Sequence, residues 1–224
     1  MKAKKIYKKK IDWNSKKAKE FLDEPRIRKM LSLVGTNKKV LDVGCFTGDV
    51  ALEIKKKGNE VIGIDCNTEF VKMTQKKGID AKFANFEEKF PFKNESFDLI
   101  IAGEIIEHIY HTENFLKECH RVLKKDGEII ITTPNINYWV YRIKMLFGKT
   151  LPFGIESGED TEANPGHVRY YTVESLRKTM EKFEFENKII TSSNIINRKI
   201  KLEKIAEIWP SIGYHIILKA KKVN

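Results

Sequence analysis

The chain has 224 residues, enough for one α/β domain, and its hydrophobic fraction of 41% is ordinary for a protein with a full core. No apolar run approaches the ~18 residues of a membrane span, and no apolar stretch follows the charged start, so we expect neither a transmembrane segment nor a signal peptide. The three cysteines have no Cys-x-x-Cys spacing, which argues against a disulfide framework or a zinc knuckle. We therefore expect a cytoplasmic protein.

The net charge of +11 is concentrated at one end of the chain. Residues 1–20 contain nine lysines against Asp12 and Glu20, a local net charge of +7, which leaves +4 for the other 204 residues. The excess is therefore a lysine-rich arm and not a basic groove. We assign residues 1–12 to this arm, which could add non-specific affinity for RNA or anionic lipid, and residues 13–224 to a single domain.

The apolar pattern after the arm predicts strands that alternate with helices. Residues 14–34 follow a helical period that ends at Gly35. Short β-rich runs then lie at 40–43, 61–64, 81–84, 98–102 and 128–132, and helical segments lie between them near 49–57, 68–77 and 112–123. This alternation is typical of βαβ units and a parallel sheet with right-handed crossovers.

The remainder of the chain interrupts this alternation. Residues 134–168 are expected to form an insertion, with a helix over 137–147 and then a loop rich in Gly, Pro, Glu and Asp. A loop of this length inside a compact domain is often a lid or a substrate-binding element. The last expected elements are a helix over 173–183, a strand over 186–192, a helical stretch near 198–208 and a strand over 213–219.

The ends of the first two strands carry residues suited to a cofactor. The first strand leads into Asp42, Gly44 and Gly48, where glycine lets the backbone turn tightly and lets a ligand approach it closely. The second strand ends in Asp65, 21 residues beyond Gly44. A carboxylate at that place can accept hydrogen bonds from both hydroxyls of a ribose.

The end of the third strand completes this pattern. Asn85 and Phe86 offer an amide and an aromatic face to an adenine ring, and the switch-point rule brings all three strand ends to one ligand. The Gly-x-Gly-x-x-Gly fingerprint of NAD does not fit, because Phe46 stands at its second glycine. Asp42 would repel a pyrophosphate, whereas it would attract the cationic methionine end of S-adenosylmethionine.

These residues lie in segments that resemble a known family. LDVGCFTGDVALEIKKKGNEVIGID resembles the first two motifs of class I S-adenosylmethionine-dependent methyltransferases, and the resemblance continues through NFEEKFPF, ESFDLIIAGEIIEHI, RVLKKDGEIIITTPN and HVRYYTVESL, over roughly residues 38–182. It implies a doubly wound, Rossmann-like α/β fold whose seven-stranded sheet is mostly parallel, with an antiparallel last strand and helices on both faces.

The resemblance also implies the cofactor and the residues that bind it. The cofactor would be S-adenosyl-L-methionine, with its methionine end at Asp42, Gly44 and Gly48, its ribose at Asp65 and its adenine at Asn85 and Phe86. The other expected contacts are Cys45, Phe46, Cys66 and Glu104. Two residues depart from the family pattern: Phe46 stands where a glycine or small residue is common, and Asn85 replaces the usual Asp.

The segment after the fourth strand carries the expected chemistry. If a helix begins at Glu104, then Glu104, Glu107 and His108 lie at i, i+3 and i+4, on one face that looks into the crevice. With His167 as a fourth candidate ligand, these residues could bind Mg²⁺ or another divalent metal, which could acidify a hydroxyl. This arrangement resembles the metal-dependent small-RNA 2′-O-methyltransferases and the ubiquinone-pathway O-methyltransferases.

A site without metal is the alternative. Glu-His pairs after the fourth strand are also widespread among methyltransferases without a metal, where Glu107 and His108 would structure the turn and His167 would cap the next helix. In that case His108 or His167 would be the catalytic general base, because imidazole titrates near neutral pH.

Several functions remain open from the sequence. The absence of Asp/Asn-Pro-Pro-Tyr after the fourth strand favours an oxygen acceptor, and TPNINYWVYRIKMLFGK resembles methyltransferases of surface-polysaccharide pathways. We therefore expect O-methylation of a small-molecule, sugar or lipid-linked hydroxyl, with an RNA 2′-O-methyltransferase and a non-catalytic S-adenosylmethionine-binding protein as alternatives. The helix over 138–147 could be a lid, a lipid-facing helix or a docking face, or it could pack on the sheet.

Overall fold

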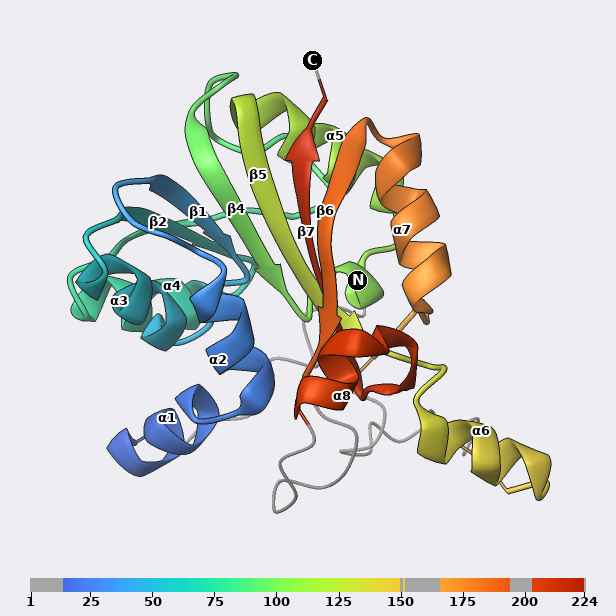
Figure 1. The fold of residues 1–224 in the computed structure, drawn as a ribbon. Coiled ribbons are helices and arrows are strands. Elements are labelled where there is room, and N and C mark those ends of the chain that lie inside the picture. The colour runs from blue at the N-terminus through green and yellow to red at the C-terminus, as the bar shows by residue number, and fades with distance from the viewer. Residues whose placement is uncertain (1–13, 150, 152–165, 194–202, 224) are drawn as a thin grey trace.

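A twisted sheet of seven strands forms the centre of the described part of the chain, which comprises residues 14–149, 151, 166–193 and 203–223 of a computed structural model (Figure 1). The strands are β1 (Lys39–Val43), β2 (Glu60–Asp65), β3 (Asp80–Phe83), β4 (Phe97–Gly103), β5 (Leu123–Pro134), β6 (Phe185–Ser192) and β7 (His215–Lys222). Their order is β3-β2-β1-β4-β5-β7-β6, and β7 runs antiparallel to both of its neighbours. The expected mostly parallel sheet with an antiparallel last strand is confirmed.

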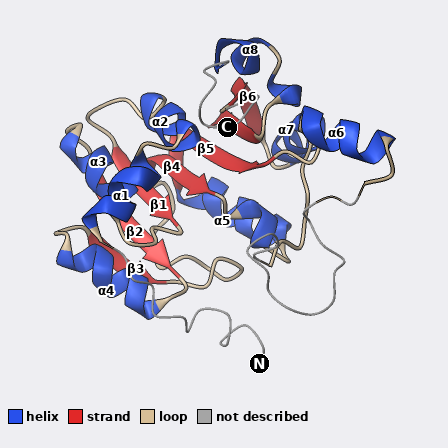
Figure 2. Ribbon diagram, turned by 90° about the horizontal axis from the view of Figure 1, so that it is seen from below, coloured by secondary structure: helices blue, strands red, loops and turns tan. Residues whose placement is uncertain are grey.

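Helices cover both faces of this sheet. The described helices are α1 (Ser15–Leu22), α2 (Pro25–Ser32), α3 (Asp49–Lys56), α4 (Thr68–Lys76), α5 (Thr112–Val122), α6 (Trp139–Leu146), α7 (Val173–Lys182) and α8 (Glu203–Ile208). Of these, α6 extends away from the sheet (Figure 1). Because side chains alternate along a strand, Leu41 joins a core cluster with Phe115 of α5, whereas its neighbour Val40 joins a second cluster with Ile27 of α2. Figure 2 shows the sheet between α2 and α3 on one side and α5 on the other.

The parallel strands fix where a ligand can bind. β1 lies between β2 and β4, and the chain proceeds from β1 to one edge of the sheet and then from β4 towards the other. The carboxyl ends of β1 and β4 therefore flank the topological switch point, where open α/β sheets bind their ligands.

Some elements differ from the sequence predictions. The helix expected over 14–34 is two helices, because Pro25 lacks a backbone N–H and begins α2. The helix expected near 198–208 is seen as α8, and residues 198–202 lie outside the described residues, as do the arm at 1–12 and residues 150 and 152–165 of the insertion. Among the residues that the structure describes, no helix is both long and apolar enough to span a bilayer.

Candidate functional site

The turn between β1 and α3 has the left-handed backbone that its glycines allow. Gly44 and Gly48 have φ of 76° and 79°, and Phe46 between them has φ of 47°. A non-glycine residue in this region costs roughly 1 kcal/mol or more, so the backbone favours glycine at the position of Phe46. The Phe46 ring packs edge-on against Phe70 of α4, 4.5 Å between centroids, and lies 6.3 Å from Phe21 of α1. These contacts offset the strain of the turn.

Asp65 at the end of β2 holds this turn in place. One of its carboxylate oxygens accepts a hydrogen bond from the backbone N–H of Phe46 at 3.0 Å, and the other accepts one from Asn67 at 2.8 Å. Burial raises the pKa of Asp65, and the backbone N–H groups oppose that rise. The turn after β1 and the end of β2, which are predicted to share a ligand, are therefore joined by a direct hydrogen bond.

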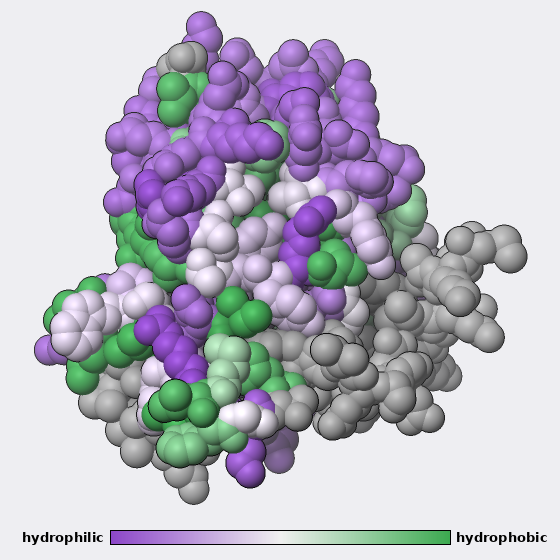
Figure 3. All heavy atoms as spheres, turned by 90° about the vertical axis from the view of Figure 1, so that its right-hand side faces the viewer, coloured by the Kyte–Doolittle hydropathy of each residue, from purple (hydrophilic) through white to green (hydrophobic). Residues whose placement is uncertain are grey.

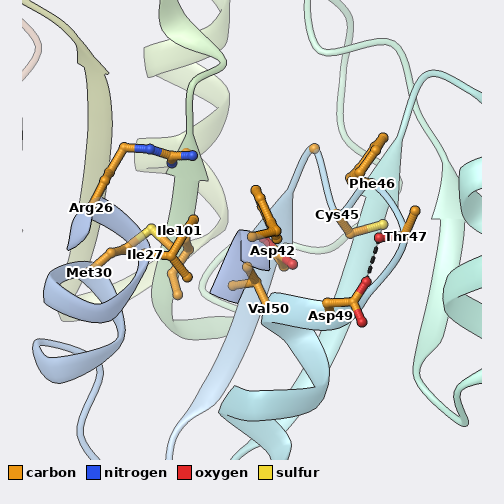
Figure 4. A pocket seen from close by; sticks show the side chains of 13 residues that line it. Arg26, Ile27, Met30, Asp42, Cys45, Phe46, Thr47, Asp49, Val50 and Ile101 are labelled. Atoms are coloured by element: carbon orange, nitrogen blue, oxygen red, sulfur yellow. Dashed lines mark hydrogen bonds between the residues drawn. The ribbon is translucent and has the colours of Figure 1, made fainter. Parts of the chain in front are cut away.

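Asp42 and Arg26 line one pocket beside the switch point. Figure 4 shows Arg26 with Met30 of α2 on one side and Asp42 with Val50 on the other. Both charged side chains are buried, and the Asp42 Oδ2 and the Arg26 Nε have no hydrogen-bond partner within the described residues. Burial, and secondarily the charge of Asp65, raises the pKa of Asp42 to about 7. The pocket thus presents an acceptor and a donor that lack hydrogen bonds.

Arg26 is a site residue that the sequence analysis missed. Its guanidinium donates to the Thr132 hydroxyl at 3.1 Å and lies 3.9 Å from the Glu104 carboxylate. Its position in the sequence could have indicated this role, because Arg26 stands beside Ile27 and four residues before Met30, on the buried face of α2. A charged residue on that face needs a buried partner.

The residues expected near the adenine lie at the end of β3 and in the turn after it. Asn85 is exposed, and its side chain accepts from the backbone N–H of Glu87 at 3.1 Å and donates to Glu88 at 2.8 Å. Phe86 is buried within the core, which leaves its ring little free surface. Cys66 is exposed, whereas Cys45 is buried beneath the turn.

Glu104 does not begin a helix. It has φ of 57°, and its backbone N–H donates to the Thr132 carbonyl at 2.9 Å, which extends the pairing of β4 with β5. The expected helical face with Glu104 at its start is therefore wrong, since the first turn is a 3₁₀ turn over Ile106–His108.

The side chain of Glu104 has its own partners. Its carboxylate accepts from Thr132 at 3.0 Å and lies 3.6 Å from Nε2 of His215, the first residue of β7 and a second residue that the sequence analysis missed. Burial opposes ionisation of Glu104, but Arg26 and His215 outweigh it and lower its pKa. Glu104 is therefore ionised and turned towards Arg26.

The other three proposed metal ligands do come together. Glu107, His108 and His167, here called the Glu-His-His cluster, each offer one ligand atom, and these atoms lie within 4.8 Å of one another. Glu107 is buried, and neither its Oε1 nor the Nδ1 of His167 has a hydrogen-bond partner in the described chain. The Glu107 carbonyl accepts from the N–H groups of Val168 and Arg169, which brings His167 to the site.

His108 has a defined proton arrangement within this cluster. Its Nδ1 lies 3.3 Å from the carbonyl oxygen of Gly166. A carbonyl can only accept, so Nδ1 carries the proton of the neutral ring and Nε2 has the free lone pair. Burial lowers the pKa of His108, and burial together with the neighbouring His108 lowers that of His167. Both rings are therefore neutral near pH ~7 and can accept protons or bind cations.

Comparison with protein families identifies the domain that contains these residues. Residues 41–131 match the family model described as a methyltransferase domain. This segment is a methyltransferase domain. The resemblance to class I S-adenosylmethionine-dependent methyltransferases is therefore confirmed. The methyltransferase domain includes the turn after β1, Asp65 and the pair Glu107 and His108, whereas Arg26 and His167 lie outside the matched segment.

Curated relatives share this segment. The mitochondrial ubiquinone biosynthesis O-methyltransferase of Mus musculus is 33% identical over 132 residues, which cover 55% of this chain and 36% of that protein. The demethylmenaquinone methyltransferase of Thermotoga maritima is 32% identical over 131 residues, which cover 54% of this chain and 57% of that protein. The chain thus spans between about a third and somewhat over half of these relatives.

A solved structure is similar over nearly the whole chain. It is an S-adenosylmethionine-dependent methyltransferase of Thermotoga maritima, described as a possible histamine N-methyltransferase, with a TM-score of 0.68 and 20% identity. The similarity covers 92% of this chain and 95% of that one, and it shows the fold.

Proposed function

We propose that this chain is an S-adenosylmethionine-dependent methyltransferase that methylates a hydroxyl of a small molecule. The observation that carries the proposal is a pair of buried charged side chains at the switch point, Asp42 and Arg26, in each of which one polar atom, Oδ2 of Asp42 and Nε of Arg26, has no hydrogen-bond partner among the described residues. The methionine end of S-adenosylmethionine has one ammonium and one carboxylate. A ligand with these two charges would supply partners for both atoms, since a buried polar atom without a hydrogen bond is costly.

The adenosyl part would lie along the rim from Asp65 to Asn85. Each carboxylate oxygen can accept more than one hydrogen bond, so Asp65 can hold the turn and still accept from ribose hydroxyls. Gly44, Phe46 and Gly48 would bring the backbone close to the methionine end. Asn85, at the edge of this rim, would be the residue nearest the adenine amino group.

The Glu-His-His cluster would bind the methyl acceptor and remove the proton of its hydroxyl group. S-adenosylmethionine supplies a methyl group on a sulfonium. The acceptor oxygen would form a bond to that methyl carbon as the carbon–sulfur bond breaks, with its electron pair passing to sulfur. The Nε2 atom of His108 would accept the hydroxyl proton, since Nδ1 is engaged by Gly166. His167 is the second candidate base.

The acceptor class rests on the relatives and on the cluster. The relatives' names concern ubiquinone and menaquinone compounds, which are small molecules, and this supports a small-molecule acceptor over RNA or a glycan. If His108 or His167 lies beside the methyl group as proposed, an oxygen acceptor is favoured, because a hydroxyl must lose its proton to a base. The cytoplasm remains our proposed compartment, since Cys45, Cys66 and Cys119 are free thiols.

Binding of S-adenosylhomocysteine, the product that remains when S-adenosylmethionine has lost its methyl group, tests this proposal. We expect S-adenosylhomocysteine to bind the wild-type chain with a stoichiometry of about one in calorimetry, and Arg26→Gln to bind at least about tenfold more weakly, since a charge-assisted hydrogen bond is lost. Arg28→Gln is the matched control, because it removes the same charge from an exposed position of α2.

Two results would separate the alternatives. Failure of the wild-type chain to bind either S-adenosylmethionine or S-adenosylhomocysteine contradicts the proposal. Binding without methyl transfer to any pool of small hydroxylated acceptors or RNA would instead support a non-catalytic binding protein.

A divalent metal is a second element of the proposal. Glu107, His108 and His167 supply one carboxylate and two imidazoles, a set that suits a divalent transition metal better than Mg²⁺, and Oε1 of Glu107 has no hydrogen-bond partner among the described residues. When bound, the metal would lower the pKa of an acceptor hydroxyl. Glu104 would stay outside this set, as its carboxylate is held by Thr132 and Arg26.

Metal removal tests this element. After EDTA treatment, we expect turnover to fall and to return on addition of Mg²⁺ or Mn²⁺, and we expect Mn²⁺ to raise the unfolding temperature of the wild-type chain but not of Glu107→Gln. Glu113→Gln is the control, because Glu113 is an exposed carboxylate of α5. Full activity in EDTA would contradict the metal and leave His108 or His167 as the general base.

A further inference from the structure

Helix α6 projects from the body of the molecule with its apolar side chains uncovered. In Figures 1 and 2, α6 extends away from the sheet in both views. All residues from 142 to 149 are exposed, and Leu146 and Phe147 keep 80% and 71% of their accessible surface. The alternative that this helix packs on the sheet is therefore wrong for its second half. Exposed apolar side chains that adjoin one another mark an interaction surface.

The exposed residues of α6 are arranged as in helices that lie on membranes. Ile143, Leu146 and Phe147 are spaced i, i+3 and i+4, so they form one apolar stripe. Arg142 precedes this stripe, and Lys144 and Lys149 are the other charged residues of the segment 136–149, which contains no Asp or Glu. On a helical wheel Arg142 and Lys144 lie on opposite sides of the stripe, and Lys149 follows the end of the helix. Long basic side chains beside an apolar stripe suit the interface of an anionic bilayer.

The start of α6 is fixed by contacts with the rest of the domain, so the apolar stripe has a defined position on the surface. The Tyr138 ring lies 5.1 Å from that of Tyr141 and 5.3 Å from that of Tyr214, which precedes β7. The Asn135 amide donates to the carbonyls of Ser211 and Gly213 at 3.0 and 2.8 Å. These contacts join the start of α6 to the chain before β7, while the second half of the helix extends beyond them.

We propose that α6 docks on an anionic lipid surface, with Leu146 and Phe147 inserted among the acyl chains and Lys144 and Lys149 at the lipid phosphates. Charge decides between this occupant and a second copy of the chain. A symmetric dimer through α6 would bring three basic residues against the same three, without a compensating acid in the segment. An anionic bilayer supplies both the negative charge and the apolar medium.

The distribution of hydrophobic side chains on this side of the molecule agrees with a lipid surface at α6. Figure 3 views the molecule from the side on which α6 projects, and hydrophobic side chains gather at the lower left of this view, below a mostly hydrophilic upper part. Helix α6 begins five residues after β5 ends, at the carboxyl edge that also carries the Glu-His-His cluster. The docking itself depends on α6 alone and does not require methyl transfer.

Vesicle flotation of the full chain tests the proposal. We expect the wild-type chain to float with vesicles of phosphatidylcholine mixed with phosphatidylglycerol and much less with phosphatidylcholine alone. The double variant Leu146→Ser with Phe147→Ser should bind the mixed vesicles at least about tenfold more weakly, because it lacks the two exposed apolar side chains that would insert among the acyl chains. Lys144→Glu with Lys149→Glu should remove the preference for phosphatidylglycerol.

A matched control removes equally exposed apolar side chains elsewhere. Ile208→Ser with Trp209→Ser changes side chains that are 73% and 64% exposed at the end of α8, where Glu207 carries a negative charge, and should leave flotation unchanged. All variants keep the lysines of residues 1–12 and should keep the wild-type unfolding temperature, because the changed side chains are exposed. Equal flotation of the wild type and the Leu146/Phe147 variant would contradict the proposal. So would a concentration-dependent dimer that this variant abolishes.

Discussion

Asp42 is the residue at which stability and ligand binding make opposite demands. Its carboxylate is buried, and burial raises its pKa from 3.8 to about 7. Because the folded chain binds the proton more tightly than the unfolded chain, Asp42 stabilises the fold below pH 3.8 and this contribution is lost as the pH rises through about 7. A cationic ligand needs the ionised form, which is the form that the fold alone disfavours.

The substitution Asp42→Asn should separate these two demands. It removes a buried charge, so we expect the variant to unfold at a higher temperature than the wild type at about pH 8, and the difference to shrink at about pH 5. The same variant should bind S-adenosylmethionine more weakly at the higher pH, because the ammonium loses its counter-charge. Thermal unfolding and calorimetry at both pH values measure these effects, and an Asn variant that is less stable at the higher pH would contradict this explanation.

Other residues show which parts of the site the sequence can predict. Asp42 and Asp65 follow apolar strand runs, so their positions at one edge of the sheet follow from the order of strands and helices. Arg26 and His215 could not be placed in this way, because they come from a helix before β1 and from β7, far apart in the chain. Their meeting at Glu104 depends on how α2 and β7 pack, which local pattern does not encode.

At the scale of elements, the turn after β1 lies close against α4. A Cβ added at Gly48 would lie 2.9 Å from the backbone Cα of Thr74, a distance that real Cβ atoms do not show. The Thr74 hydroxyl also donates to the carbonyl of Phe46 at 3.0 Å. The turn and α4 are therefore packed closely together, and the proposed cofactor site includes this contact.

Alanine at two glycines measures this contact. Gly78 has φ of 74° and an added Cβ there would meet nothing within 4 Å, so Gly78→Ala should cost only the backbone strain of about 1 kcal/mol. Gly48→Ala has the same strain and also the clash with Thr74, so it should destabilise the chain by about 2 kcal/mol more. Denaturant unfolding compares the two free energies. Equal losses would show that the turn is not packed against α4.

The elements also show why some sequence predictions succeeded. The central strands are covered on both faces, so their continuous apolar runs locate them within a few residues. Glu104 was placed at a helix start because its spacing with Glu107 and His108 fits a helix. The pairing of its backbone with Thr132 prevents that, and this pairing depends on a strand about 28 residues later in the chain.

At the scale of the whole molecule, the sheet order brings together groups that no single segment contains. Arg26 from α2, Asp42 from β1 and Glu104 from the end of β4 meet at the switch point, and His167 joins from the end of the expected insertion. The methyltransferase domain match covers the central part of this arrangement. The sequence could predict the fold and the position of the strand ends at one edge of the sheet, because both follow from strand order; that this edge binds the cofactor stays a prediction.

A crystal structure of the chain with S-adenosylhomocysteine tests the central claim most directly. We predict that the carboxylate of the ligand lies at Arg26, its ammonium at Asp42 and its ribose hydroxyls at Asp65, with the sulfur directed towards the Glu-His-His cluster. Ligand density away from the carboxyl ends of β1 and β4, or a ligand whose amino-acid end contacts neither Arg26 nor Asp42, would contradict the account.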